Sequence, residues 1–109
     1  NEPGDDFGLE THVVNLTEST IAANARFFAS ADEVPRHALS MGIKNIMNAR
    51  RILIAVSGEE KADIVRRAFT GHVTKEVPAS ILQLHPDVTL VGDRAALHKL
   101  VEAGVSVCG

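Results

Sequence analysis

The 109-residue sequence contains no Trp, no Tyr, only four Phe and a single Cys. So few aromatic side chains argue against a surface on which nucleic-acid bases stack. Because the lone cysteine, Cys108, has no partner for an internal disulfide, we expect a reducing, cytoplasmic setting. The longest apolar run, residues 52–56, is far too short to span a bilayer. A net charge of −3 without a block of like charge predicts neither a nucleic-acid partner nor a membrane partner.

The residues that are present are those of an ordinary folded chain. Hydrophobic residues make up 45% and charged residues 23%, both typical of globular proteins, and a chain of 109 residues allows one domain. The sequence begins with Asn1 rather than Met. We therefore expect that something was removed from the chain or that it is part of a longer one.

The second half of the sequence has the clearest pattern. Residues 51–57 are an apolar run bounded by charge and a glycine, which predicts a strand buried on both faces. The segments after it predict a helix over 59–69 ended by Gly71 as a C′ residue, a short helix over 78–84, a second buried strand over 87–91, and a helix over 94–103 ended by Gly104. Strands joined by helical crossovers predict an α/β fold, a Rossmann-like open sheet of parallel strands.

The first half is less regular. Residues 11–16 predict a short strand, and Thr17 can cap a helix from about 18 to 28, with Ile21, Ala25 and Phe28 on one apolar stripe. Residues 29–36 predict a connection, 37–43 are ambiguous, and a short helix is predicted over about 43–49.

A candidate site lies where the first buried strand ends. In open parallel sheets, ligands bind beyond the carboxyl ends of the strands, at the start of the next helix. Lys61 precedes Ile64 and Val65 at helical offsets, so it continues their apolar stripe at the crevice end. One interpretation is that Lys61 binds a phosphate beside the free N–H groups of the first turn. The other is a solvated lysine in a turn whose Glu59 and Glu60 complement the helix dipole.

Other chemistry-bearing residues give weaker signals. Arg26 lies near the end of the first predicted helix, where it could bind a phosphate through its guanidinium or complement the helix dipole. The five histidines show no metal-ligand spacing, and we expect no metal site. His85 precedes the second strand as a turn element. No nucleophile-elbow or dinucleotide motif occurs in the sequence.

Several segments, in order and with matching spacing, resemble the C-terminal part of the glucosamine-6-phosphate deaminase family of sugar-phosphate aldose–ketose isomerases and deaminases. The resemblance covers residues 1 to about 93. The segments are Asn-Glu-Pro-Gly at 1–4, Thr-His-Val-Val-Asn-Leu-Thr at 11–17, Asn-Ala-Arg-Phe-Phe at 24–28, Val-Pro-Arg-His-Ala-Leu-Ser-Met-Gly-Ile at 34–43, Ser-Gly-Glu-Glu-Lys-Ala at 57–62 and Val-Pro-Ala-Ser-Ile-Leu-Gln-Leu-His-Pro at 77–86.

The resemblance implies roles for three residues. Glu2 corresponds to the carboxylate that pairs with the catalytic histidine during opening of the sugar ring, and Arg26 and Lys61 correspond to residues that hold the substrate phosphate. The implied reaction converts glucosamine 6-phosphate and water to fructose 6-phosphate and ammonia, with no metal and no organic cofactor. As the second residue of the chain, Glu2 could also be disordered.

The resemblance also implies what these residues lack. The family's aspartate base, its ring-opening histidine and its N-terminal phosphate loop would all precede Asn1. We therefore expect residues 1–109 to be the C-terminal portion of a larger domain, inactive alone, which associates with the remaining N-terminal part or forms a homo-oligomer. Two alternatives stay open: a non-catalytic sugar-phosphate sensor of a transcription regulator, and a related sugar-phosphate isomerase or lactonase.

Overall fold

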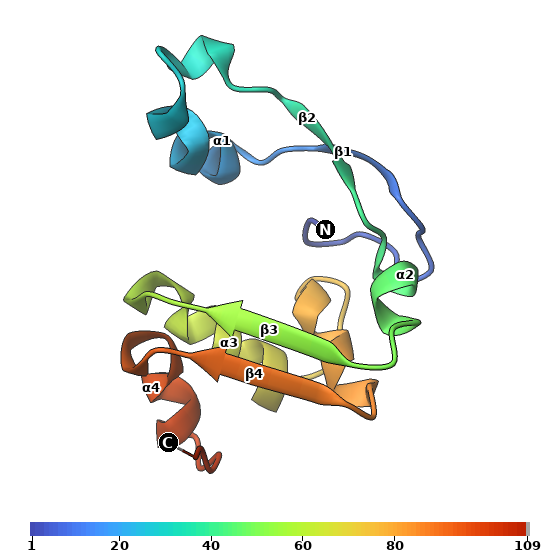
Figure 1. The fold of residues 1–109 in the computed structure, drawn as a ribbon, viewed down its shortest axis with the longest axis vertical. Helices are drawn as coiled ribbons and strands as arrows, with labels where there is room; N and C mark the ends of the chain where they lie inside the picture. The colour runs from blue at the N-terminus through green and yellow to red at the C-terminus, as the bar shows by residue number, and fades with distance from the viewer. Residues whose placement is uncertain (109) are drawn as a thin grey trace.

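A computed structural model describes residues 1–108 of the chain. The chain forms two parts, which Figure 1 shows one above the other: an N-terminal arm, residues 11–40, and a C-terminal unit, residues 51–103. The short helix α2 (Ile43–Met47) lies where the chain passes from the arm to the unit. The molecule measures 43 × 30 × 22 Å, so the two parts lengthen it along one axis.

The C-terminal unit contains the predicted parallel strands. Strand β3 (Ile52–Val56) pairs with β4 (Val88–Gly92) in parallel, with Ile52 opposite Val88 and Val56 opposite Gly92. Helix α3 (Ala62–Thr70) and the 3-10 helix η4 (Pro78–Leu84) form the crossover, and α4 (Arg94–Glu102) follows β4. The predicted α/β class with a helical crossover is therefore confirmed.

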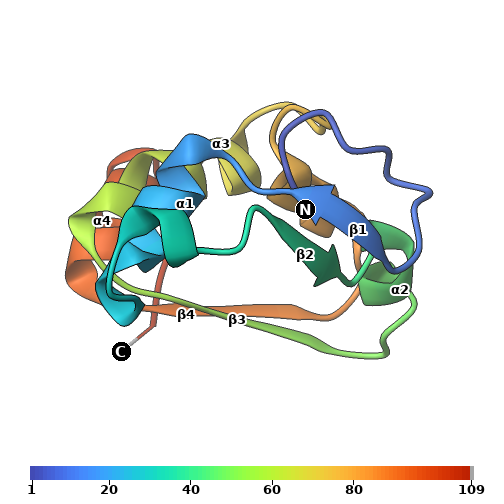
Figure 2. The ribbon, with the colours of Figure 1, turned by 90° about the horizontal axis from the view of Figure 1, so that it is seen from above.

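The core of this unit lies between the sheet and its helices. Figure 2 shows the sheet nearly edge-on with α3 and α4 along one side of it. The apolar faces of the helices supply side chains of at most 7% exposure, and Ala62 and Ala96 are fully buried. Small side chains at these two positions let the helices pack closely. The remaining apolar members of the core are Val65, Ala68, Val77, Leu82 and Leu100.

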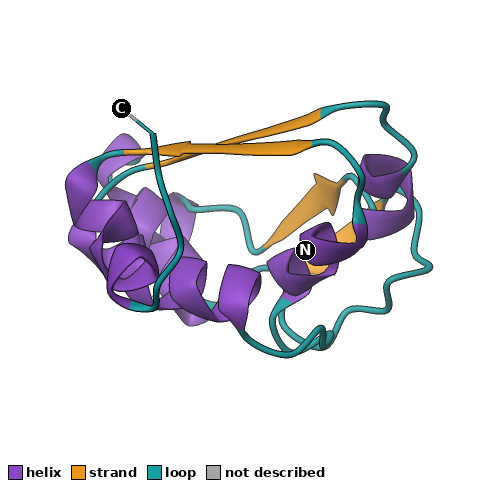
Figure 3. Ribbon diagram, turned by 90° about the horizontal axis from the view of Figure 1, so that it is seen from below, coloured by secondary structure: helices purple, strands orange, loops and turns teal. Residues whose placement is uncertain are grey.

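The opposite face of the sheet is uncovered. Exposure alternates along β3 and β4, and Leu53 is 70% exposed and Val91 53% exposed. Figure 3 shows that the helices of the described residues lie on one side of these strands. The prediction that both strands are buried on both faces is therefore wrong for residues 1–108, because an apolar run shows that a strand can be covered and not what covers it.

The ends of α3 differ from their predicted form. The predicted helix over 59–69 divides into the 3-10 helix η3 (Glu59–Lys61) and α3. Gly71 ends α3, but its φ of −88° is not left-handed. The side-chain amide of Gln83 instead donates to the carbonyls of Ala68 and Gly71, at 2.7 and 3.0 Å. Carbonyls at a helix end need such partners when the chain does not turn back on itself.

The start and end of α4 agree more closely with the prediction. Gly104 follows the end of α4, as predicted, and has a left-handed φ of +95°. Asp93 begins α4 by accepting the N–H of Ala96 on its side chain at 2.8 Å. This N-cap bond satisfies one of the four N–H groups that a helix start leaves without a helical partner.

The arm is a two-stranded ribbon with a helix at its far end. Strand β1 (His12–Asn15) pairs antiparallel with β2 (His37–Ser40), in the segment whose pattern was ambiguous. Helix α1 (Glu18–Asn24) is capped by Thr17, as predicted, and its Ile21 is buried. The ribbon is a second sheet, separate from β3 and β4.

The first helix is shorter than its apolar stripe predicts. It ends at Asn24 and continues as the 3-10 helix η1 (Ala25–Phe27), and a second 3-10 helix, η2 (Ala31–Glu33), follows. Phe28 is 40% exposed. The predicted apolar stripe is therefore buried at its first residue, Ile21, and exposed at its last, Phe28. Likewise α2 ends at Met47, short of the predicted residue 49.

Candidate active site

The sequence-predicted corner lies at the carboxyl end of β3. Gly58 turns the chain there with φ +97° and ψ 148°, a conformation that is open almost only to glycine. Its N–H donates to the Asp93 carboxylate, with N–O distances of 3.2 and 3.3 Å. Because the same carboxylate caps α4, Asp93 joins the loops that follow the two parallel strands. Sequence reasoning missed this bond, which joins residues 35 positions apart.

Lys61 lies in this corner, but not in the first turn of an α-helix. It ends the 3-10 turn η3 and precedes α3, and its side chain is exposed. Within residues 1–108 the Lys61 ammonium makes no ion pair. A cation without a carboxylate partner is available to an incoming anion.

Glu59, the first residue of this 3-10 turn, is bonded to a histidine of α4. Glu59 Oε1 lies 2.7 Å from Nε2 of His98, and Glu102 Oε1 lies 3.3 Å from Nδ1 of the same ring. The hydrogen bond to Glu59, followed by the one to Glu102, raises the pKa of His98 above its usual value. This cluster joins η3 to α4, and sequence reasoning did not find it because Glu59 lies 39 positions before His98 in the chain.

Arg26 lies on η1, at the end of the arm. Its guanidinium carbon is 4.5 Å from the centre of the Phe27 ring, a cation–π contact, and its side chain is exposed. Figures 1 and 2 both place α1 on the same side of the molecule as the carboxyl end of β3, and Figure 1 shows the two separated along the longest axis. The elements that carry Arg26 and Lys61 thus share a side of the molecule but belong to its two different parts.

Glu2 is half-buried in an ordered turn between the arm and the C-terminal unit. Gly4 in the same turn donates its N–H to the Lys75 carbonyl at 2.8 Å, and the side-chain amide of Asn1 donates to the Met41 carbonyl at 2.9 Å. In the structure, Glu2 therefore belongs to a turn whose neighbouring residues are hydrogen-bonded to both parts of the molecule. No hydrogen bond or ion pair joins Glu2 to the arginine of η1 or the lysine of η3 within the described residues.

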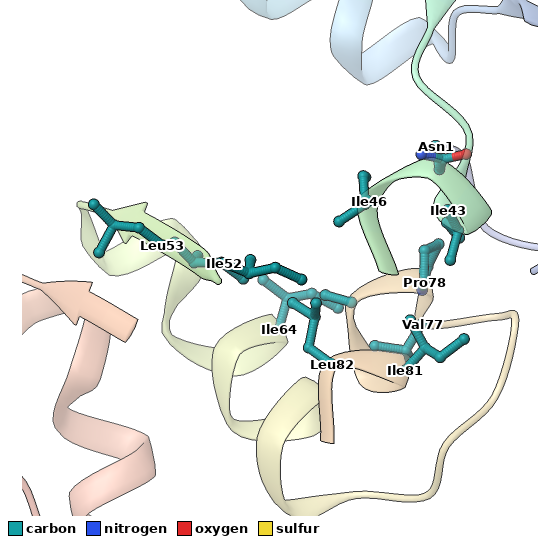
Figure 4. A pocket seen from close by; sticks show the side chains of 12 residues that line it. Asn1, Ile43, Ile46, Ile52, Leu53, Ile64, Val77, Pro78, Ile81 and Leu82 are labelled. Atoms are coloured by element: carbon teal, nitrogen blue, oxygen red, sulfur yellow. The ribbon is translucent and has the colours of Figure 1, made fainter. Parts of the chain in front are cut away.

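An apolar groove of about 470 Å³ lies at the amino end of β3, away from the corner. Figure 4 shows side chains from α2, β3, α3 and η4 around it. Apart from Asn1 its lining is apolar, so it offers few groups to a phosphate or a sugar. The lining residues are Asn1, Ile43, Ile46, Ile52, Leu53, Ile54, Ile64, Val77, Pro78, Ala79, Ile81 and Leu82.

His85 has a structural contact rather than a place in the corner. His85 accepts the Asp87 N–H on Nδ1 at 3.0 Å, so its Nε2–H donates to the Ala49 carbonyl at 2.7 Å and ties the turn before β4 to the end of α2. Among residues 1–108, no three His, Cys, Asp or Glu side chains gather as metal ligands do. No helix in the described part of the chain is long and apolar enough to cross a membrane.

Comparison with known proteins gives consistent matches. The family described as "Glucosamine-6-phosphate isomerases/6-phosphogluconolactonase" matches residues 7–91. Proteins named glucosamine-6-phosphate deaminase match over 100 residues, at 57% identity in Streptococcus thermophilus and 58% in Lactobacillus johnsonii. These matches cover 92% of this chain but only 43% and 42% of the two relatives.

A solved structure agrees with the sequence matches. It is described as a monomeric glucosamine-6-phosphate deaminase and superposes with a TM-score of 0.85 at 49% identity. The superposition covers 90% of this chain and 41% of the solved one. The chain thus spans about two fifths of the length of the relatives that it matches.

Proposed function

Because the chain belongs to the family of glucosamine-6-phosphate isomerases and 6-phosphogluconolactonases, we propose that it takes part in the deamination of glucosamine 6-phosphate. In this reaction a proton moves from C2 to C1, water adds at C2 and ammonia leaves, giving fructose 6-phosphate. The observation that carries the proposal is the identity of 57–58% to proteins named for that deamination, over nearly the whole chain. The same names favour deamination over lactone hydrolysis.

We propose that Arg26 and Lys61 hold the phosphate of the substrate. Both side chains are exposed, and their elements lie on the same side of the molecule in Figure 1. A dianion held by two cations fixes one end of the sugar, so that proton transfers occur at the other end in a set geometry. The Asp93–Gly58 bond supports this arrangement, because it holds the loop before Lys61 against the start of α4.

Glu2 is the carboxylate that we propose to assist acid–base chemistry. Its turn is ordered and lies between the two parts of the molecule, whereas a flexible terminal residue would be poorly placed for proton transfer. It does not serve as the base at C2, for which no residue of this chain has a motif-based assignment. We therefore propose that residues 1–109 alone do not deaminate the sugar phosphate.

The uncovered sheet face supports a partner for this chain. Leu53 and Val91 expose apolar surface on one face of β3 and β4, and Leu53 also lines the apolar groove. We propose that this continuous apolar surface binds polypeptide equivalent to the three fifths of the relatives that the chain does not span. Association of two copies through the same face is the alternative outcome.

A chimera tests the activity directly. Residues 1–93 would replace the matching part of the Streptococcus thermophilus relative, and ammonia release from glucosamine 6-phosphate would be measured beside hydrolysis of 6-phosphogluconolactone. We expect the chimera to release ammonia from glucosamine 6-phosphate, because the exchanged segment is 57% identical to the part that it replaces. Lactone hydrolysis without ammonia release would overturn the proposal.

A further inference from the structure

The turn that carries Glu2 is closed by a single residue. The Asp5 N–H donates to the Glu2 carbonyl at 3.0 Å, which closes a four-residue turn with Pro3 and Gly4 in its centre. Gly4 has a φ of +91°, the value that the third position of a type II turn requires, and proline suits the second position. The turn is therefore pre-set by its sequence.

Asp5 also bonds back to the start of the same turn. Its Oδ2 accepts the Glu2 N–H at 2.8 Å, so both backbone polar groups of Glu2 are bonded to Asp5. A charged acceptor makes the stronger kind of backbone hydrogen bond. These two bonds fix the backbone of Glu2, and with it the direction in which its side chain leaves the backbone.

The His12 ring of β1 lies beside the Asp5 side chain. Its Nε2 lies 3.7 Å from Asp5 Oδ2, which is ion-pair range but longer than a hydrogen bond. That nitrogen is buried and has no hydrogen-bond partner among the described residues, while Nδ1 lies 2.6 Å from the Glu10 carbonyl. The Asp5 and His12 side chains are only 24% and 21% exposed. The carboxylate is thus confined between the turn and the first strand of the arm.

We infer that Asp5 is a positioning residue for the Glu2 carboxylate, with His12 restricting Asp5. The inference rests on the proposed role of Glu2. The next residue shows the contrast: the carboxylate of Asp6 accepts the Gly8 N–H at 2.7 Å and does not bond to Glu2. The two adjacent carboxylates therefore accept hydrogen bonds from different backbone N–H groups, a difference that the sequence alone does not reveal.

Steady-state kinetics of the chimera test this inference. Asp5→Ala should lower kcat by about ten- to a hundredfold and leave KM within about twofold, because Glu2 is displaced while the phosphate ligands are untouched. Asp5→Asn keeps an acceptor for the Glu2 N–H and should restore most of kcat. Asp6→Ala is the matched control and should have near-parental kinetics. A merely structural role for Asp5 would lower the amount of folded enzyme instead.

The outcomes separate the two proposals. If Glu2→Gln keeps full activity, the role of Glu2 is wrong and the inference falls with it. If Glu2→Gln loses activity while Asp5→Ala has the kcat of Asp6→Ala, only the positioning role is overturned. Hydrogen exchange at the Glu2 amide, measured by NMR, gives a second readout that needs no activity. Asp5→Ala should speed this exchange and Asp6→Ala should not; equal rates in the two variants would contradict the inference.

Discussion

The arm and the C-terminal unit are built from similar residues but are stabilised differently. In the unit, two helices cover one sheet face, and Ala62 and Ala96 are fully buried. In the arm, Val13 is 66% exposed and Leu39 is 77% exposed, on a ribbon of only two strands. An isolated two-stranded ribbon has little stability of its own. The two proposed phosphate ligands are therefore supported by parts of different stability: Lys61 lies on the well-packed unit and Arg26 on the arm.

The largest expected effect is on ammonia release, because neither the arm nor the unit has an assigned base for the proton at C2. The chain alone should release no measurable ammonia from glucosamine 6-phosphate, since loss of a general base alone typically lowers the rate by about 10²–10⁴-fold. Mixing with the complementary segment of the Streptococcus thermophilus relative should restore turnover. The control is the chain carrying Leu53→Lys and Val91→Lys, which should fail to respond to the segment. Turnover by the chain alone near the rate of the relative would contradict the prediction.

The next prediction tests the packing of the unit against that of the arm. Leu100 is 3% exposed on α4, and Leu100→Ala should lower the free energy of unfolding by about 2–5 kcal/mol. In the arm, Leu39→Ala removes an exposed side chain and should change it by about 0.5 kcal/mol or less. Urea unfolding followed by circular dichroism measures both. Val101→Ala, at a 46% exposed neighbour on α4, controls for the loss of helix side chains in general. Equal effects in the two parts would remove the contrast.

The third prediction compares how Lys61 and Arg26 contribute to the binding of glucosamine 6-phosphate. Lys61→Ala and Arg26→Ala should each weaken binding of glucosamine 6-phosphate to the chimera by about 1.5–3 kcal/mol, because each removes a charged partner of the phosphate. That corresponds to roughly ten- to over a hundredfold in Kd. Calorimetry should show nearly unchanged binding of unphosphorylated glucosamine. Arg66→Ala is the control, since Arg66 is already paired with Asp63 at 3.2 Å. Equal losses for both sugars would exclude the phosphate role.

A smaller effect is expected at the turn before Lys61. Gly58→Ala places a side chain at φ +97°, and its Cβ would lie 2.6 Å from the Glu60 carboxylate. We expect a loss of about 1–3 kcal/mol in the free energy of unfolding, mostly from the backbone conformation. Gly104→Ala is the matched control, because its φ is +95° and a Cβ there meets nothing within 4 Å. If Gly104→Ala lost more stability than Gly58→Ala, the contact of the new Cβ with Glu60 would not add to the cost of the left-handed backbone conformation.

The smallest effect is a pH dependence at the contact between η3 and α4. Because the pKa of His98 is raised in the folded chain, its contribution to stability is present below its ordinary value of 6.5 and is lost as the pH rises through the folded value. His98→Gln should therefore destabilise the chain at about pH 5.5 and have little effect at about pH 9. His72→Gln, at an exposed position, is the control for unfolding curves at the two pH values. A greater loss at the higher pH would contradict the sign.

The sequence predicts the local part of this architecture well. The apolar run of β3 and the cap of α1 at Thr17 are encoded by adjacent residues, and the structure has both. The segment of β2 was ambiguous, because a four-residue strand depends on its pairing with β1. The uncovered face at Leu53 could not be foreseen, since an apolar side chain does not reveal which element lies against it.

The candidate site was predictable where a motif carries it and not where distant residues meet. The turn at Lys61 was predicted from the strand–turn–helix pattern, and the structure has it. The roles of Glu2 and Arg26 come from the family resemblance and stay predictions. The bond between Asp93 and Gly58 joins two loops that no local pattern connects. Asp93 does precede a predicted helix, as N-cap residues do, so its capping role had a signal and its bond to the corner had none.

The two fully buried alanines limit how this chain can vary. Ala62 and Ala96 are fully buried, so a larger side chain at either position would overpack the core. Both positions lie near the start of a helix: α3 follows the Lys61 turn directly, and α4 follows Asp93 directly. Any enlargement would push a helix away from the sheet and shift the turn at its start. A library of random variants selected for phosphate binding should therefore accept many residues at exposed positions such as Glu60, and almost only glycine, alanine or serine at positions 62 and 96.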